Sequence, residues 1–253
     1  VMRTFRRAES ERPLLSPAKS SILRASLIRA NACRFADRYD VQKPIGEGTF
    51  GRVHRCVDNL GRASRAVKRI PIPEDTERHA ALKVEVAALV MLDHPHIVRL
   101  IEYFVEGNEL LLVMELLQGP SLGYRMQEIG RFPEELASRC VRHMLKALFC
   151  CHCQGIAHND VSPENFRFQT EQLHSSLKMV DFGLSAHCLR SQSQPQLAEG
   201  DGGSILFAQE HDIWGAGVIL FAMLSGTELF PQVSSADPCT CHPAGGPVAH
   251  LAR

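Results

Sequence analysis

The segment HNDVSPEN, residues 158–165, is followed by DFG at residues 181–183, and these two motifs decide how the chain is interpreted. Both supply aspartate or asparagine oxygens, which are the ligands that magnesium prefers. Upstream, GEGTFGRV at residues 46–53 spaces three glycines so that backbone N–H groups can approach phosphate oxygens. Such a glycine pattern alone is more often a flexible turn. Three phosphate- and metal-handling motifs in this order indicate one site.

The first half of the chain has the pattern of a strand-rich unit around these glycines. Residues 39–72 alternate apolar and polar side chains and are broken by turn residues at 46–48 and 58–61. Two further strands are expected at residues 98–105 and 109–115. The pattern predicts an antiparallel sheet whose first hairpin carries the glycines.

Three further segments have helical spacing or an apolar run. Residues 77–92 have a helical pattern, with one apolar face formed by Leu82, Val86, Leu89 and Val90. A longer helix is predicted over 133–154, with Pro133 in its first turn and Gly155 after its end. Its buried stripe should contain Leu136, Cys140, Met144, Leu148 and Cys151. The apolar run 213–224 is expected to form a buried helix, so the fold class is α+β with two lobes.

The order and the residues of these motifs resemble the signature set of eukaryotic protein kinases. Residues 92–100, 181–185 and 212–226 resemble the calcium/calmodulin-dependent group of serine/threonine kinases. The resemblance implies a small antiparallel-sheet N-lobe with one helix and a mainly helical C-lobe. It also implies transfer of a phosphoryl group from ATP to a serine or threonine hydroxyl of a protein substrate, with Mg²⁺ as cofactor.

The same resemblance assigns roles to individual residues. Asp160 would be the catalytic base, and Lys68, paired with Glu85, would hold the α- and β-phosphates. Asn165 and Asp181 would bind magnesium. Nucleotide binding would involve Ile45, Gly46, Gly48, Gly51, Val53, Ala66, Lys68, Met114, Glu115 and Leu117, with the last three in the hinge between the lobes.

Several positions depart from the family pattern. Asn159 replaces the arginine that clamps a phosphorylated activation loop, and Ser162 replaces the lysine that offsets charge on the transferred group. Arg167 stands where an apolar residue lies under adenine, so it is expected either to be buried at a cost or to extend outward. Ser121 replaces an acid that helps some relatives to recognise basic peptides. We therefore expect impaired turnover, and the alternative is a pseudokinase that acts as a nucleotide-binding or scaffolding module.

The largest departure follows Ala208-Gln209-Glu210, which resembles a family landmark but is followed two residues later by Asp212. Two residues span at most about 7 Å, so both landmarks cannot occupy their usual places. We interpret the chain as an internally deleted and C-terminally truncated kinase domain that frays beyond Glu210 and exposes an apolar helix face. The predicted domains are a basic disordered extension (1–37), an N-lobe (38–115), a partial C-lobe (116–231) and a disordered tail (232–253).

Composition bears on nucleic-acid binding, membrane association and cellular location. The chain has 28 basic and 28 acidic residues, which argues against a general nucleic-acid binder. No apolar run reaches the roughly 20 residues of a membrane span, so no membrane association is expected. Nine cysteines without a secretory signal favour reduced thiols, and a cytoplasmic location is expected, with organelle targeting by the basic N-terminus as the minority alternative. Residues 150–153 contain three cysteines and a histidine on one predicted helix, which favours core packing over a metal site.

Overall fold

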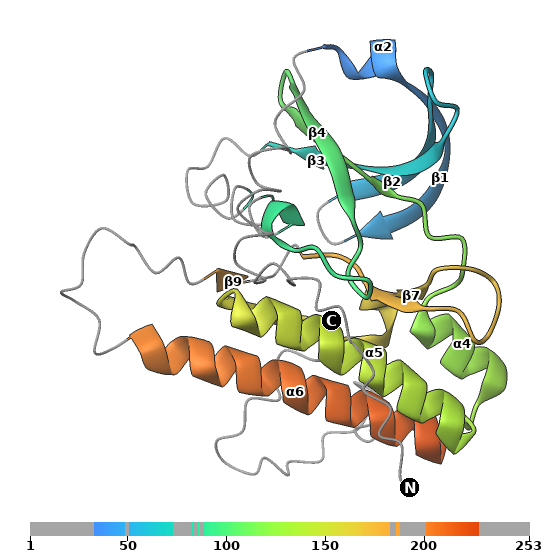
Figure 1. Ribbon diagram of the computed structural model, residues 1–253, viewed down its shortest axis with the longest axis vertical. Coiled ribbons are helices and arrows are strands. Elements are labelled where there is room, and N and C mark those ends of the chain that lie inside the picture. Colours follow the sequence, from blue (N-terminus) through green and yellow to red (C-terminus); the bar gives the residue numbers. More distant parts are fainter. Residues whose placement is uncertain are drawn as a thin grey trace, which may run out of the picture.

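The computed structural model describes residues 33–48, 51–72, 82, 86, 89–182, 186–187 and 201–227. A five-stranded antiparallel sheet forms one lobe, and two long helices dominate the other (Figure 1). The sheet runs in the order β1-β2-β3-β5-β4 and consists of β1 (Tyr39–Gly48), β2 (Gly51–Asp58), β3 (Ser64–Pro71), β4 (Leu100–Glu106) and β5 (Glu109–Glu115). The predicted two-lobed α+β class is confirmed.

The alternation of side chains along the strands gives the sheet two apolar faces. One face, with Val67, Phe104 and Val113, forms a small core with Phe35 and Tyr39. Phe35 lies in the short helix α2 (Phe35–Arg38), so the folded region begins ahead of residue 38. The other face contributes Ile70, Leu100, Leu110 and Leu112 to a larger core that continues into the helical lobe. β1 lies at the sheet edge, where Pro44 causes a register shift without breaking a central ladder.

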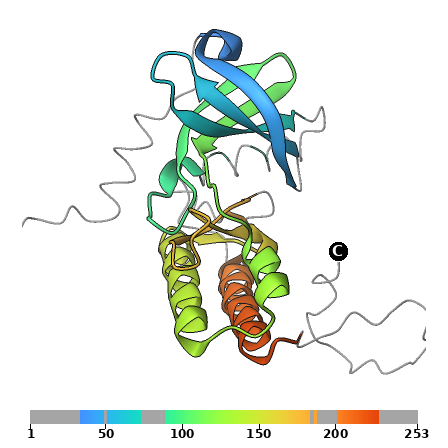
Figure 2. The same ribbon diagram turned by 90° about the vertical axis from the view of Figure 1, so that its right-hand side faces the viewer.

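The helical lobe is built on α5 (Glu134–Cys153), which lies beside α6 (Asp201–Ser225) in both views (Figures 1 and 2). The five side chains predicted to be buried on α5 are all in the core. Pro133 is the N-cap rather than part of the first turn, and Gly155 adopts φ 71°, which a glycine tolerates at a helix end. Cys151 is buried and Cys150 packs partly buried against the core, as expected, whereas Cys153 is exposed, so the predicted core packing holds for part of the cluster.

Short elements complete the lobe. Ser121 caps α4 (Leu122–Ile129) by accepting a hydrogen bond from the Tyr124 N–H at 3.1 Å. The 3₁₀ helix η1 spans Pro163–Asn165. The remaining strands form two small antiparallel pairs: β6 (Ile156–Ala157) with β9 (Ala186–His187), and β7 (Phe166–Phe168) with β8 (Leu177–Met179).

The structure corrects the prediction for the end of the lobe. The chain was expected to fray beyond Glu210, but α6 continues without interruption through Ala208–Glu210 to Ser225. Its inner side is buried at Asp212, Ala216, Ile219 and Met223. Its outer side is not: Ile213 is 46% exposed, Trp214 54% and Phe221 43%. The expected buried helix therefore exists, with one exposed apolar face.

Among the described residues, no helix combines the length and apolar character needed to cross a membrane.

Candidate functional site

An ion pair joins the two lobes at the position where the motifs predicted phosphate and metal chemistry. Lys68 on β3 donates a hydrogen bond from Nζ to Asp181 Oδ1 at 2.7 Å. The two side chains are only 5% and 14% exposed, so the pair is poorly screened by water. Asp181 lies two residues after the end of β8 and has φ 56°, a left-handed backbone conformation that is uncommon outside glycine. Residues 113 apart in sequence therefore meet in one site.

Asp160 and Asn165 form the second part of the site. The Asn165 side-chain Nδ2 donates to the Asp160 carbonyl oxygen at 2.9 Å and to Asp160 Oδ2 at 2.8 Å. Asn165 ends η1, and its backbone oxygen accepts from the Val180 N–H at 2.8 Å. This bond places Asn165 beside the residue that precedes Asp181. Because the amide nitrogen faces Asp160, the oxygen Oδ1 is the atom of Asn165 that can serve a metal ion.

The loop that carries Asp160 is anchored by a buried carboxylate. Asp212 on α6 is fully buried and accepts hydrogen bonds from the backbone N–H groups of His158 and Asn159, both at 2.8 Å. His152 Nε2 on α5 lies 2.8 Å from the same carboxylate. These contacts compensate the cost of burying a charge. They also hold Asn159 at φ 62°, a left-handed conformation that asparagine tolerates.

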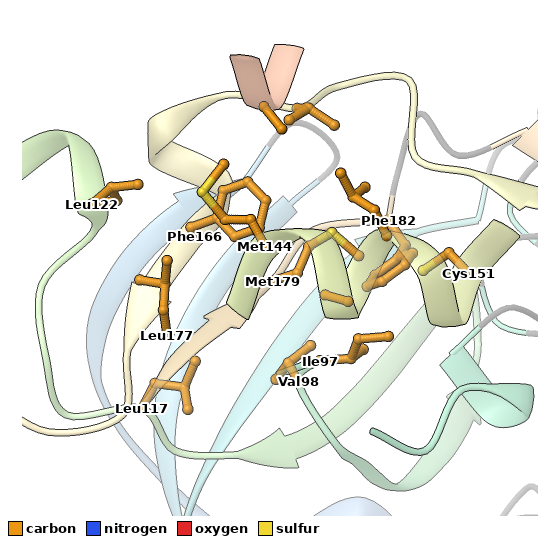
Figure 3. Close-up of a cluster of buried hydrophobic side chains, with 14 of the residues drawn as sticks. Ile97, Val98, Leu117, Leu122, Met144, Cys151, Phe166, Leu177, Met179 and Phe182 are labelled. Atoms are coloured by element: carbon orange, nitrogen blue, oxygen red, sulfur yellow. The ribbon is translucent and has the colours of Figure 1, made fainter. Parts of the chain in front are cut away.

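Aromatic packing fixes Phe182, the residue after Asp181. Its ring lies 5.1 Å from the His158 ring in an edge-on arrangement, and both side chains are buried. Figure 3 shows Phe182 among the apolar side chains that surround α5, with Met179 and Cys151 nearby. The loop that carries Asp160 and the strand end that carries Asp181 are therefore held against one core.

The sheet forms the roof of the site. Val53 on β2 lies directly opposite Lys68 on β3, and Ala66 lies opposite Met114 on β5. Positions two apart on a strand share a face, so Ala66 and Lys68 point to the same side of the sheet. Ile45 is half-buried, and Leu117, just after β5, is buried. Val53, Ala66, Lys68 and Met114 thus share one face of the sheet, and Leu117 lies on the segment that leaves it.

The glycines of the motif lie at the end of β1 and the start of β2. Gly48 pairs with Gly51, and Gly46 pairs with Val53. A Cβ atom on Gly51 would lie 1.9 Å from the Arg69 carbonyl oxygen, so no other residue fits there without a shift of the strand. At Gly46, a Cβ would meet nothing within 4 Å. Gly51 therefore has a packing role in the sheet, whereas Gly46 leaves open space on its side.

Arg167 is neither fully buried nor extended into solvent, the two outcomes expected from the sequence. It is half-buried on β7, and its Nη2 donates to the Gly119 carbonyl oxygen at 3.0 Å. Burial lowers the pKa of Arg167, and the nearby Glu171 opposes this effect. The guanidinium thus extends along the hinge rather than into free solvent.

Sequence reasoning missed one ion pair next to the hinge. Lys178 on β8 donates from Nζ to Glu115 Oε1 at 2.6 Å. The signal that could have found it is a lysine between Leu177 and Met179 in an otherwise apolar strand. Glu85, which was predicted to pair with Lys68, lies outside the described residues. Four neighbours on the predicted helix do contact the core as expected: Leu82, Val86, Leu89 and Val90.

Comparison with known proteins identifies the family. A family model described as "Protein kinase domain" matches residues 39–241. The chain belongs to the protein kinase domain family. It is 33% identical over 211 residues to calcium-dependent protein kinase 9 of Oryza sativa, an alignment that covers 78% of this chain and 36% of that protein. It is 28% identical over 234 residues to calcium-dependent protein kinase 10 of Arabidopsis thaliana, with 85% and 41% covered.

A third relative is a putative CBL-interacting protein kinase 27 of Oryza sativa, 32% identical over 204 residues, with 75% of this chain and 49% of the relative covered. The kinase chain thus spans less than half the length of these relatives. Similarity to calcium-dependent kinases agrees with the resemblance that the motif wording indicated.

The kinase site has the donor atoms that magnesium and a nucleotide require. The Asp181 carboxylate and the Asn165 amide oxygen are hard oxygen ligands, and the Lys68 ammonium lies beside Asp181. Lys68 would supply positive charge where phosphates are held, and Gly46 leaves open space beside β1. These residues fit the ligands that the family uses.

Proposed function

We propose that this kinase domain transfers the γ-phosphoryl group of ATP to a serine or threonine hydroxyl of a protein, with magnesium as cofactor. The observation that carries the proposal is the convergence of Lys68, Asp181, Asn165 and Asp160 at the junction of the lobes. The Pro-Glu-Asn wording after Asp160 and the similarity to calcium-dependent kinases support serine or threonine as the acceptor.

Each residue has a role that its contacts allow. Asp160 accepts the proton of the substrate hydroxyl, and the Asn165 amide orients its carboxylate through Nδ2. Lys68, fixed by Asp181, holds the phosphates in position. When bound, magnesium neutralises negative charge on the phosphates. The packing of His158 against Phe182 keeps the two halves of the site in register.

Two substitutions in the loop set the expected rate and regulation. Ser162 is neutral, so it cannot offset charge that develops on the transferred group, and turnover should be lower than with a lysine there. Asn159 cannot clamp a phosphate on the activation segment as an arginine would. Its backbone is already held by Asp212, so the loop is ordered without that clamp. We therefore propose that activity does not depend on phosphorylation of the activation segment.

The test is phosphoryl transfer from labelled ATP to a mixed serine/threonine peptide library by the purified chain. Asp160→Asn keeps the shape of the side chain but removes the base, so the rate should fall about 10²–10⁴-fold. Ser162→Lys should raise the rate. Activity that Asp160→Asn leaves intact would show that another group is the base.

The second candidate is a pseudokinase that binds nucleotide without efficient transfer. Ser162 favours it, as does the half-buried guanidinium of Arg167 next to Gly119. This candidate predicts magnesium-dependent nucleotide binding with no transfer by the wild-type chain or by Ser162→Lys. Transfer that Ser162→Lys restores would instead assign a kinase site weakened at one position.

A further inference from the structure

Two cations lie directly opposite each other on the hairpin under the hinge. Arg167 on β7 is the cross-strand partner of Lys178 on β8. Like charges opposite each other on neighbouring strands repel, and here Lys178 is buried and Arg167 is half-buried. Such a pair is tolerated when each cation finds a partner elsewhere. Both partners lie on the segment that connects the lobes.

Lys178 is bound to the start of this segment and Arg167 to its end. Lys178 Nζ lies 2.6 Å from Glu115 Oε1, and Arg167 Nη2 lies 3.0 Å from the Gly119 carbonyl oxygen. Glu115 is the last residue of β5, and Gly119 also donates its N–H to the Phe168 carbonyl oxygen at 3.2 Å. The hairpin therefore holds the hinge at both ends, four residues apart.

The Glu115 carboxylate links the hairpin to the sheet lobe as well. The same atom, Oε1, accepts a hydrogen bond from the Arg99 N–H at 2.8 Å. The Glu115 N–H in turn donates to the Arg99 carbonyl oxygen at 3.0 Å. Arg99 directly precedes β4, so one carboxylate connects the start of β4, the hinge and β8. The Lys178 and Glu115 side chains are 9% and 20% exposed, which limits screening of the pair.

We propose that Glu115, Lys178 and Arg167 form a hinge brace, in which Glu115 and Lys178 are positioning residues that fix the hinge backbone for nucleotide binding. The brace acts on the backbone from Glu115 to Leu117, whose predicted task is to bind adenine. The Glu115 side chain contacts Arg99 and Lys178, so only its backbone groups would be left to contact adenine. The ligand part of this proposal rests on the proposed function, whereas the restraint on the hinge stands on the contacts themselves.

The first experiment measures the dissociation constant of a non-hydrolysable ATP analogue with magnesium by calorimetry. Lys178→Met should weaken binding about 10-fold, and Lys178→Arg should restore most of the loss. Glu115→Gln should also weaken binding, and the double variant should lose no more than the worse single variant because both remove one interaction. If the two losses simply add, the brace is contradicted.

A matched control is available on the same sheet. Arg69 and Glu109 form an exposed ion pair between β3 and β5, away from the hinge. Arg69→Met removes one charge of an ion pair, as Lys178→Met does, and should leave the dissociation constant unchanged. In a transfer assay, Lys178→Met should raise the KM for ATP while kcat changes little. An equal fall of kcat at unchanged KM would argue for a general structural defect and against the brace.

Hydrogen exchange separates failure of the brace from failure of the proposed function. In the full chain without nucleotide, Lys178→Met should speed exchange of the Arg99 and Gly119 amides at least 10-fold, with amides of α5 unchanged. If the wild-type chain binds no nucleotide but this exchange increases, the proposed function is wrong and the brace stands. If exchange at the hinge is unaltered, the brace is wrong whatever the nucleotide affinity.

Discussion

The sheet lobe and the helical lobe differ in how completely their apolar surfaces are buried. Both faces of the sheet are covered, one by Phe35 and Tyr39 and the other by the larger core. Among the described residues, helix α6 is covered on one side, whereas Trp214 and Phe221 on its other side are exposed. A helix that is apolar all round is usually buried all round. The two faces of the sheet are covered by its own short helix and by the larger core. The outer face of α6 would need a further packed element to cover it, and the apolar pattern of the helix does not provide one.

The largest effect on stability should come from the covered sheet lobe. Phe104 on β4 is fully buried and contacts the rings of Phe35 and Tyr39. Phe104→Ala should lower the free energy of unfolding by about 3–5 kcal/mol, because it removes a large side chain and leaves a cavity. Urea denaturation followed by circular dichroism measures the change. A loss below about 1 kcal/mol would mean that the small core does not stabilise the sheet.

The buried side of α6 should give the next effect. Asp212→Ala removes the carboxylate that accepts from the His158 and Asn159 N–H groups, and loss of the buried acceptor of His158 alone should cost about 1–3 kcal/mol. The loss should centre on the loop around Asp160, so its amides should exchange faster than those of the sheet. Uniformly faster exchange over both lobes would contradict an anchoring role that is local to this loop.

A histidine cluster predicts a moderate pH effect at the junction of the lobes. His96 and His143 stack with ring centroids 3.9 Å apart, and His94 lies 5.4 Å from His96. Burial, then the neighbouring His96, lowers the pKa of His94 and of His143 to about 4 each, with Lys146 adding to both shifts. The unfolded chain takes up protons first, so stability should fall as the pH drops from about 6.5 to 4.

The measurement for this prediction is the thermal midpoint across that pH range. His143→Gln should flatten the dependence because it removes one of the shifted groups. An unchanged slope in His143→Gln would show that other groups cause the loss of stability in acid.

The smallest effect on stability should come from the exposed face of α6. Trp214→Gln should change the free energy of unfolding by no more than about 0.5 kcal/mol, since the ring is half in solvent. It should nevertheless reduce self-association, because exposed apolar patches promote aggregation. Light scattering at increasing concentration, with the buried Met223→Gln as a destabilised control, tests this. A large loss of stability for Trp214→Gln would mean that the outer face is covered.

The sequence predicted the parts of the fold whose pattern is local. The buried stripe of α5 follows from the recurrence of Leu136, Cys140, Met144 and Leu148 alone. The extension of α6 was missed because Ala208, Gln209 and Glu210 were matched to a family landmark. All three are strong helix formers, and this preference prevailed.

The candidate site divides in the same way. The resemblance to protein kinases implied roles for Lys68, Asp160, Asn165 and Asp181, and only the fold shows that Lys68 meets Asp181. The lysine in the apolar strand β8 could have indicated a buried ion pair, but its partner Glu115 lies 63 positions away and only the fold identifies it. The partner of Arg167 is a backbone carbonyl, which no residue type reveals.

We propose above all that the junction of the sheet lobe and the helical lobe binds a nucleotide together with magnesium. The most direct measurement is a thermal-shift titration of the whole chain with ATP, with and without magnesium, for the wild type, Lys68→Met and Asp181→Asn. In the wild type the midpoint should rise with ATP when magnesium is present, because ligand at 100 times its dissociation constant adds about 2.7 kcal/mol to the free energy of unfolding. Both variants should lose this rise. A folded wild-type chain whose midpoint responds to neither ATP nor magnesium would contradict the account.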